Sequence, residues 1–317
     1  MGRYILRRII SLIVVTICVA ILIFTVMYFI PGDPMDIIMP EATVAEKEAM
    51  RESLGLNESY IVQLGTYLYD TFIRFDFGTS YALNSTVISE LANRVPRTLL
   101  LSWMCILLDA LIGIPLGIAA AMHRNSWIDR GLMLFAMIGV SLPNFWLALM
   151  LVVVFSLNLG WLPSMGIATW KGWILPIVSN TVGGLASNAR QTRSAVLETI
   201  RADFVTTARA KGVSENGVIY KHMLPNAMIP IINGLGSRLA TSIAGTVVIE
   251  QVFSFPGVGT YLITGINSRD YPVVRSSILV LAVFSAVVML LVDLIYAYID
   301  PRIKAQYQST GKKKGGK

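Results

Sequence analysis

The sequence predicts an all-α protein that crosses a membrane several times, and both its composition and its apolar runs indicate this class. Hydrophobic residues make up 55% of the 317 residues, only 14% are charged, and the mean hydropathy is +0.64. A soluble domain carries about 25% charged residues. The apolar residues gather into continuous runs of about 20, the helix length that crosses a bilayer. Because lipid offers no partner to backbone N–H and C=O groups, we expect these runs to be helices.

The apolar runs predict about six spans, an even number that places both termini on one side of the membrane. The first run is too long for a signal-peptide core and is followed by Pro31-Gly-Asp-Pro34, so we expect it to stay as a span. Pro115 and Pro143 predict bends, and Gly113 and Gly117 predict the close approach of a second helix. The expected spans are residues 9–30, 98–122, 132–157, 173–189, 227–250 and 276–299.

Four regions follow from these spans. Residues 1–30 are the N-terminal cytoplasmic end and first span, and residues 31–97 form an extracytoplasmic helical segment. Residues 98–300 form a core of about five spans that includes a cytoplasmic loop, residues 190–226, and residues 301–317 form a basic cytoplasmic tail. Lys and Arg set the orientation, because they concentrate at both termini and in residues 190–226. This bias accounts for the net charge of +7 without any nucleic acid.

The long segment 31–97 has sequence signals of its own structure. Thr43-Val-Ala-Glu46 fits a capping box at a helix start, and Gly55 fits the stop. Residues 60–75 carry aromatic and aliphatic side chains at helical spacing. Two interpretations remain open here: a helical cap on the outer membrane surface, and a docking face for an extracellular partner.

Motifs of catalysis and metal binding are missing from the sequence. The Gly311-Lys312 pair lacks the rest of a phosphate-binding loop. His123 and His222 lie far apart, and Cys18 and Cys105 fall inside apolar runs as expected of buried hydrophobes. We therefore expect no enzyme, no metal site and no cofactor on this chain, so that the energy for any transport comes from a partner or an ion gradient.

Charged and polar residues inside spans need a reason, because each is costly in lipid. For Arg238 two interpretations are open: an arginine buried in the bundle and paired with an acid or carbonyls, or a path residue that faces an anionic substrate group. Asp109 and Asp293 are expected to be structural. Further candidates for the path are the polar residues Ser141, Asn144 and Asn233.

Residues 201–227 look soluble inside an otherwise apolar chain. Ala202 to Lys211 are good helix formers, Gly212 is a helix stop, and Ser214-Glu-Asn-Gly217 is a second start. Leu224-Pro225 predicts a turn into the fifth span. The pattern predicts two short helices joined by a tight turn, with a basic face. It is either a plain surface helix or a plug for a groove on a soluble partner.

This stretch resembles the EAA loop of ABC importer permeases, a Glu-Ala-Ala core followed by a fixed Gly and a Leu-Pro. The matching positions are Thr206-Thr207-Ala208, Gly212 and Leu224-Pro225. Thr replaces the acidic and first Ala positions, and His222 stands in place of Ile. The form "ARAKG" is typical of the peptide/nickel-type subfamily of binding-protein-dependent transport system inner membrane components. Stretches such as "RVPRTLLLS", "SLPNFW" and "VVIEQVFSFPGVG" agree in family order over almost the whole chain.

The resemblance implies a permease core of the ABC type I importer, in the inner membrane of a prokaryote. It implies a homologous second permease, two ABC ATPase subunits that bind ATP and Mg²⁺, and an extracytoplasmic binding protein that would dock on residues 31–97. A cytoplasmic helix, about residues 202–214, would insert into one ATPase. The residues expected to couple to it are Asp203, Thr206, Thr207, Ala208, Arg209, Ala210, Lys211, Gly212, Val213 and Ser214.

The substrates that we favour are short peptides, either dipeptides or oligopeptides. A metal on the path would find no Cys and only two His as ligands, because both Cys lie inside apolar runs. Nickel, a metal chelate or glutathione remains an alternative. A secondary carrier driven by an ion gradient is the alternative of another class. It predicts inverted repeats and a carboxylate-rich site at the midplane, neither of which the sequence shows clearly.

Overall fold

The computed structural model describes residues 2–299, and the predicted basic tail lies outside them. Within residues 2–299 the chain is helical, with one isolated bridge between Thr79 and Thr86. Residues 31–86, which belong to the segment expected outside the membrane and are called the outer segment below, hold α2 (Met35–Ile38), α3 (Val44–Ser53), α4 (Tyr60–Tyr69) and the π-helical turn η1 (Asp70–Arg74). The long elements are α1 (Gly2–Phe29), α5 (Val87–Leu108), the π-helical turn η2 (Asp109–Gly113), α6 (Ile114–Met122), α7 (Trp127–Ser141), α9 (Ile174–Ile200), α12 (Leu224–Val252) and α14 (Tyr271–Ile299).

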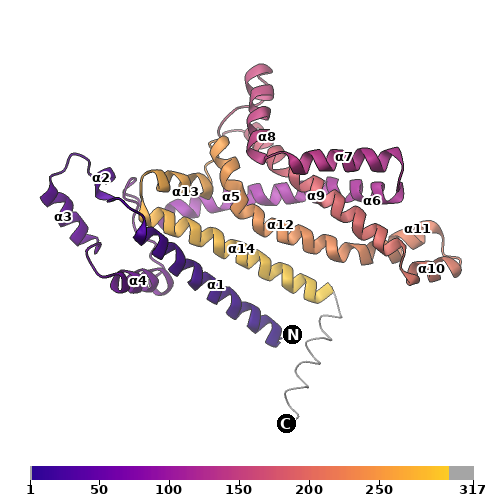
Figure 1. The fold of residues 1–317 in the computed structure, drawn as a ribbon, viewed down its shortest axis with the longest axis horizontal. Helices are drawn as coiled ribbons and strands as arrows, with labels where there is room; N and C mark the ends of the chain where they lie inside the picture. The colour runs from indigo at the N-terminus through magenta and orange to yellow at the C-terminus, as the bar shows by residue number, and fades with distance from the viewer. Residues whose placement is uncertain (1, 300–317) are drawn as a thin grey trace, which may run out of the picture.

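The long helices run along the longest axis of the molecule, with α2, α3 and α4 at one end and α10 and α11 at the other (Figure 1). Helix α9 contacts α5, α6, α7, α8 (Asn144–Leu151) and α12, and α12 also contacts α14. Helix α1 packs on α14. The predicted close approach at Gly113 and Gly117 is confirmed, since a Cβ at either glycine would crowd α9 at Asn188 or Ala189. The centre of the bundle is therefore α9, with α12 beside it.

Within residues 2–299, three helical segments are long and apolar enough to cross a membrane: Ile5–Phe29, Val87–Met122 and Tyr271–Ile295. A bent pair, Trp127–Ser141 with Asn144–Asn158, would make a fourth. Helices α9 and α12 have 27 and 29 residues, so each is about 40 Å long. They are more polar than these three segments and lack an apolar stretch long enough to meet the same requirement of length and hydropathy. Helix α5, which belongs to the expected second span, begins at Val87 instead of residue 98. Helix α9, the expected fourth span, continues past Ala189 to Ile200.

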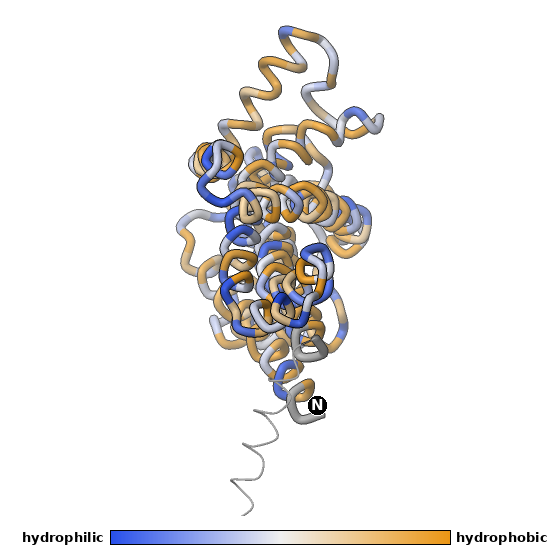
Figure 2. The backbone as a smooth tube through the Cα atoms, turned by 90° about the vertical axis from the view of Figure 1, so that its right-hand side faces the viewer, coloured by the Kyte–Doolittle hydropathy of each residue, from blue (hydrophilic) through white to orange (hydrophobic). Residues whose placement is uncertain are grey.

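The expected third span is broken in the structure. Helices α7 and α8 meet at an angle of 96°. Leu142 has an extended ψ of 124°, the conformation that a following proline imposes, and Pro143 starts the new direction. The π-helical turn η3 (Val152–Asn158) continues α8, and Figure 2 shows this mostly apolar arm standing off the bundle. The bend predicted at Pro143 is therefore confirmed, and it breaks the expected span over residues 132–157 into two helices.

Helix α13 (Val258–Asn267) is a short element that the sequence reasoning missed. It follows a turn after α12, and the buried Glu250 fixes its first turn. The Glu250 carboxylate accepts hydrogen bonds from the Gly259 N–H at 2.7 Å and from the Thr98 Oγ1 at 2.7 Å. Thr98 in turn accepts from the Val258 N–H at 2.9 Å. These bonds join α5, α12 and α13 at one end of the bundle.

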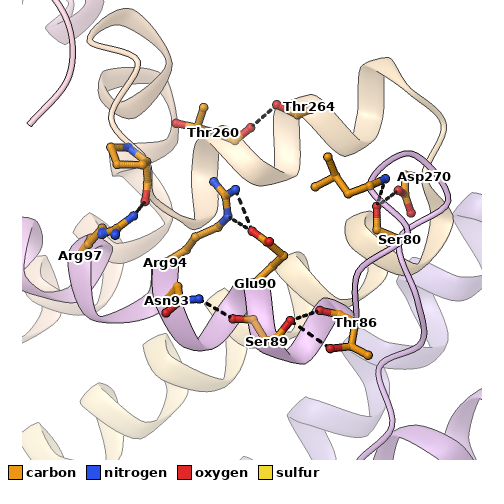
Figure 3. Close-up of polar contacts among 12 residues, drawn as sticks. Ser80, Thr86, Ser89, Glu90, Asn93, Arg94, Arg97, Thr260, Thr264 and Asp270 are labelled. Carbon is orange, nitrogen blue, oxygen red and sulfur yellow. Dashed lines mark hydrogen bonds and ion pairs between the residues drawn. The ribbon is translucent and has the colours of Figure 1, made fainter.

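The outer segment is held to the same end by polar contacts (Figure 3). The Ser80 Oγ donates to Asp270 at 2.6 Å, and Arg97 donates to the Pro256 carbonyl at 3.3 Å. Arg94 pairs with Glu90 on the same helix, and its guanidinium lies over the ring of Tyr261. Ser80 thus ties the outer segment to the residue that follows α13 by three positions, and Arg94 and Arg97 tie α5 to α13 and to the turn before it.

Two expectations for the outer segment are confirmed. Thr43 and Glu46 form the capping box of α3, and Gly55 follows it with a φ of +66°. The expected helix over residues 60–75 is α4 with η1. Its Tyr60 and Tyr67 rings lie against Phe24 of α1, at centroid distances of 5.8 and 5.4 Å. Helix α4 is therefore packed on the first span.

Candidate coupling loop and translocation path

The cytoplasmic loop expected from the sequence is a compact helical hairpin at the end of α9. Helix α10 (Asp203–Ala210) is followed by Gly212, whose φ of +74° suits a residue without a Cβ. The Ser214 Oγ then caps the next helical turn, α11 (Glu215–Gly217), by accepting from the Gly217 N–H at 3.4 Å. The predicted helix, stop and second start are all confirmed.

One face of α10 anchors it to the bundle. Val205 and Ala208 are buried in an apolar cluster with Val196 of α9, Val218 and Met223. Of the other predicted coupling residues, Val213 packs against this cluster and the rest are exposed. Val213 is half-buried, and the exposed ones are Asp203, Thr206, Thr207, Arg209, Ala210, Lys211, Gly212 and Ser214. A soluble partner could therefore reach most of the predicted set but not the Ala208 side chain.

An ion pair closes the hairpin across Gly212. Arg209 donates two hydrogen bonds to the Glu215 carboxylate, at 3.1 and 2.6 Å. These bonds lower the pKa of the Glu215 carboxyl and raise that of the Arg209 guanidinium. Both side chains are exposed, so the pair orients Arg209 more than it stabilises the fold.

Two exposed aromatic residues of this hairpin were missed. Phe204 is 43% exposed and Tyr220 is 68% exposed, on either side of the buried Val205 and Val218. Large apolar side chains exposed next to a buried face are typical of contact surfaces. The helical spacing of Val205 and Ala208 was the signal, since it leaves Phe204 on the outer face.

The expected turn at Leu224-Pro225 is not there. A π-helical segment, η5 (Val218–Met223), leads directly into α12, and Pro225 occupies the first turn of that helix. Proline is compatible with this place, where its missing N–H leaves no intrahelical bond unmade. The second arm of the hairpin, α11 with η5, consequently forms one continuous helical rod with α12.

Arg238 of α12 lies inside the bundle, opposite the π-helical turn η2. Its guanidinium pairs with Asp109, and it donates to the Asn180 carbonyl at 3.2 Å. Asp109 is fully buried, whereas the Arg238 side chain is 29% exposed. Asn188 donates to the Asp109 carbonyl at 2.8 Å. These contacts join η2, α9 and α12.

The remaining path candidates lie in different places. Asn144 and Arg238 both reach α9 at adjacent glycines: Gly183 faces the Asn144 Oδ1, and Gly184 lies under the Arg238 guanidinium. Ser141 is exposed and donates to the Met137 carbonyl, and Asn233 is exposed on α12. The structure thus brings Arg238 and Asn144 to one stretch of α9, and shows no contact of Ser141 or Asn233 with either.

A cavity of about 70 Å³ lies next to Arg238, between α9 and α12. Its lining is mostly polar and includes Asn188, Gln191 and Arg238. The Gln191 Nε2 bridges the two helices by donating to the Pro230 carbonyl at 3.0 Å. The partly exposed guanidinium therefore borders a small polar space.

Comparison with known proteins identifies the family. Residues 113–305 match the family described as "Binding-protein-dependent transport system inner membrane component", and residues 1–102 match the N-terminal region of such membrane components. The chain belongs to this family. The match covers α6 to α14 in the first case and α1 to most of α5 in the second.

Relatives of this inner membrane component align over nearly its whole length. The glutathione transport system permease protein GsiC of Salmonella typhi is 39% identical over 307 residues, which is 96% of this chain and 99% of the relative. The dipeptide transport system permease protein DppB of Alkalihalophilus pseudofirmus is 38% identical over 333 residues, 96% of this chain and 100% of the relative.

Solved structures of ABC transporters share the fold. An inward-facing structure of the MetNI methionine ABC transporter matches with a TM-score of 0.58 and 21% identity, over 67% of this chain and 97% of that one. An amino acid ABC transporter with histidines matches with a TM-score of 0.53 and 15% identity, over 67% and 94%. The predicted fold class, an all-α membrane protein with an ABC importer permease core, is confirmed.

Proposed function

We propose that this inner membrane component is the non-catalytic permease subunit of an ATP-driven importer that moves short peptides into the cytoplasm. Two ABC ATPase subunits would bind ATP and Mg²⁺, a homologous second permease would complete the path, and an extracytoplasmic binding protein would deliver the ligand. Both termini and the hairpin of residues 202–223 would lie in the cytoplasm, in line with the Lys and Arg bias.

The observation that carries this proposal is the two-faced hairpin. Val205 and Ala208 anchor α10 to α9 and to the segment that leads into α12, while Thr206, Thr207 and Ala210 face outward. A partner that grips the outer face would move both central helices, because the inner face is packed on them. ATP-driven closure of the ATPases would in this way alternate access to the path.

For the path itself, we propose that Arg238 faces the substrate, with Asn144, Ser141 and Asn233 as further polar contacts. The guanidinium is partly exposed beside a polar cavity and keeps donors beyond those used by Asp109 and the Asn180 carbonyl. A peptide carries a C-terminal carboxylate, which a guanidinium can bind through two parallel hydrogen bonds.

Peptides are favoured because the two relatives described above are named for the transport of glutathione, which is a tripeptide, and of dipeptides. Nickel or a metal chelate would be the second candidate. Uptake of a radiolabelled dipeptide, with glutathione and Ni²⁺ as competitors, separates these substrates.

The coupling proposal is tested by Ala210→Trp, which adds bulk to the outer face of α10 without filling the buried one. We expect the ATPase subunit to be lost on purification of the full-length chain from native membranes, and ATP-dependent dipeptide uptake to be lost with it. Ala49→Trp is the matched control for retention of the ATPase, since Ala49 is an exposed helical alanine in α3 at the other end. Retention of the ATPase by the Ala210 variant at the wild-type level would contradict the proposal.

A further inference from the structure

Two cavities adjoin the packing of α4 on α1, at the end of the molecule opposite the coupling hairpin. The first has a volume of about 230 Å³ and the second about 310 Å³. They share four lining residues, Phe24, Leu56, Gln63 and Arg275. Arg275 belongs to the first turns of α14, so both cavities border on one guanidinium.

Arg275 forms no ion pair with any residue of the described chain. Its Nε donates to the Tyr271 carbonyl of its own helix at 3.3 Å. The guanidinium lies against the rings of Tyr67 and Phe24, at 4.9 and 5.5 Å from their centroids. Ring contacts hold the plane of the group but leave its terminal N–H groups without an acceptor.

Arg51, another cation near the cavities, differs from Arg275 in this respect. Arg51 lines the second cavity but pairs with Asp33 at 3.1 Å. Arg269 lies beside Gly32, another lining residue of the second cavity. The charges of Arg51 and Asp33 cancel, so Arg275 gives the lining of the second cavity a net positive charge. The second cavity therefore suits an anionic group.

The first cavity has the opposite charge away from Arg275. Its lining includes the carboxylates of Glu58, Asp70 and Asp76. Asp70 pairs with Arg74, and Asp76 accepts from the Gly78 N–H at 2.8 Å. Glu58 has no ion pair within residues 2–299. One ligand that reached from the second cavity into the first would thus meet a guanidinium and then carboxylates.

The depth of the cavities indicates what kind of molecule could reach them. They lie where the apolar span Ile5–Phe29 ends, and Tyr28, which lines the second cavity, packs against the rings of Phe29 and Tyr60. Aromatic rings gather at the level of lipid headgroups. Below this level the face of α1 that carries Phe24 and Tyr28 exposes apolar side chains at helical spacing: Ile10, Ile13 and Ile17.

We propose that these cavities bind the headgroup of a zwitterionic phospholipid. Its phosphate would accept hydrogen bonds from Arg275, and its ammonium group would lie toward the carboxylates of the first cavity. The acyl chains would lie along the exposed apolar face of α1. The proposal does not depend on what the transporter carries or on what drives it, because it rests on the outer end of α1, α4 and α14.

The test is native mass spectrometry of the full-length chain, with the subunits that co-purify, after delipidation and titration with phosphatidylethanolamine. We expect Arg275→Gln to weaken retention of the first lipid about tenfold, the effect of losing one charge-assisted contact. Arg130→Gln is the matched control, since Arg130 is an exposed arginine of α7 and lines neither cavity. Equal retention by wild type and the Arg275 variant would overturn the proposal.

Two further arms keep the proposal testable if Arg275→Gln impairs folding. Glu58→Gln changes an exposed residue and should reduce the preference for phosphatidylethanolamine over phosphatidylglycerol. An unchanged preference would overturn the zwitterionic assignment. Free phosphoethanolamine at the concentration of the lipid should leave the lipid bound. Displacement would instead indicate a site for a soluble zwitterion and would overturn the lipid assignment.

Discussion

Arg238 and Asp109 form a pair whose two members have different surroundings. Asp109 is fully buried in the π-helical turn η2, while Arg238 keeps part of its side chain open to a polar cavity. Sequence reasoning recognised that a charge at Arg238 needs a partner or a substrate, but left both interpretations open. The partner lies 129 residues away in the chain, and helical periodicity carries no information about such a contact.

Removing Arg238 alone should destabilise the bundle, because it leaves the Asp109 carboxylate buried without its partner. We expect Arg238→Gln to cost about 3 kcal/mol of unfolding free energy. Asp109→Asn combined with Arg238→Gln should recover most of the thermal stability, measured on the purified chain in detergent.

The double variant also tests the role of Arg238 in the path. If the guanidinium binds substrate, peptide uptake should stay low after stability is restored. Recovery of uptake together with stability would assign Arg238 a structural role only. Asp109→Asn with Arg238 intact is the control, because it keeps the guanidinium and removes only its partner charge.

Helices α9 and α12 pack closely because of small residues at their contact. At this contact Gly184 of α9 lies directly under the Arg238 guanidinium, and Gly234 of α12 lies under Gln191 of α9. Gly236 of α12 admits Val292 of α14 in the same way. Small residues let helices approach within a membrane, where packing and hydrogen bonds hold helices together. The helices can approach this closely because these glycines have no side chain.

Gly184→Ala should disrupt the pair between Arg238 and Asp109, because the added methyl group would overlap the guanidinium. We expect a lowered thermal midpoint and reduced peptide uptake. Gly183→Ala is the matched control on the adjacent residue, where a Cβ would meet the Asn144 Oδ1 at 3.3 Å and needs only a small shift. Equal effects of the two variants would contradict this account.

Much of the element order could be predicted from the sequence, because apolar runs, capping boxes and helix stops are local signals. The capping box of α3 and the stop at Gly212 are examples. Helix α13 could not be predicted in this way. Its first turn is fixed by hydrogen bonds to Glu250 and Thr98. Thr98, which accepts a hydrogen bond from the Val258 N–H, is 160 residues away from Val258 in the chain. Pro143 signalled a bend, but the angle of 96° depends on how α7 and α8 pack on α9.

At the scale of the whole molecule, the outer segment and the coupling hairpin lie at opposite ends of the bundle (Figure 1). The Lys and Arg bias predicts which end faces the cytoplasm. The same separation is what an importer needs if it receives its ligand on one side and its energy on the other.

This orientation predicts how single cysteines will label. In a chain with Cys18→Ala and Cys105→Ala, a cysteine at Val44 should react with a membrane-impermeant maleimide in intact cells. A cysteine at Tyr220 should react only after permeabilisation. Both side chains are highly exposed, at 86% and 68%, so accessibility within the protein does not decide the result. The reverse labelling pattern would contradict the predicted orientation.

The continuity of η5 with α12 has a mechanical consequence. Leu224 and Arg238 lie on one helix, about 21 Å apart along its axis at 1.5 Å per residue. A tilt of only about 10° about the hairpin end would therefore carry the Arg238 backbone sideways by about 4 Å. That distance is longer than any hydrogen bond, so a small rotation where a partner grips the hairpin is enough to exchange the contacts of the guanidinium.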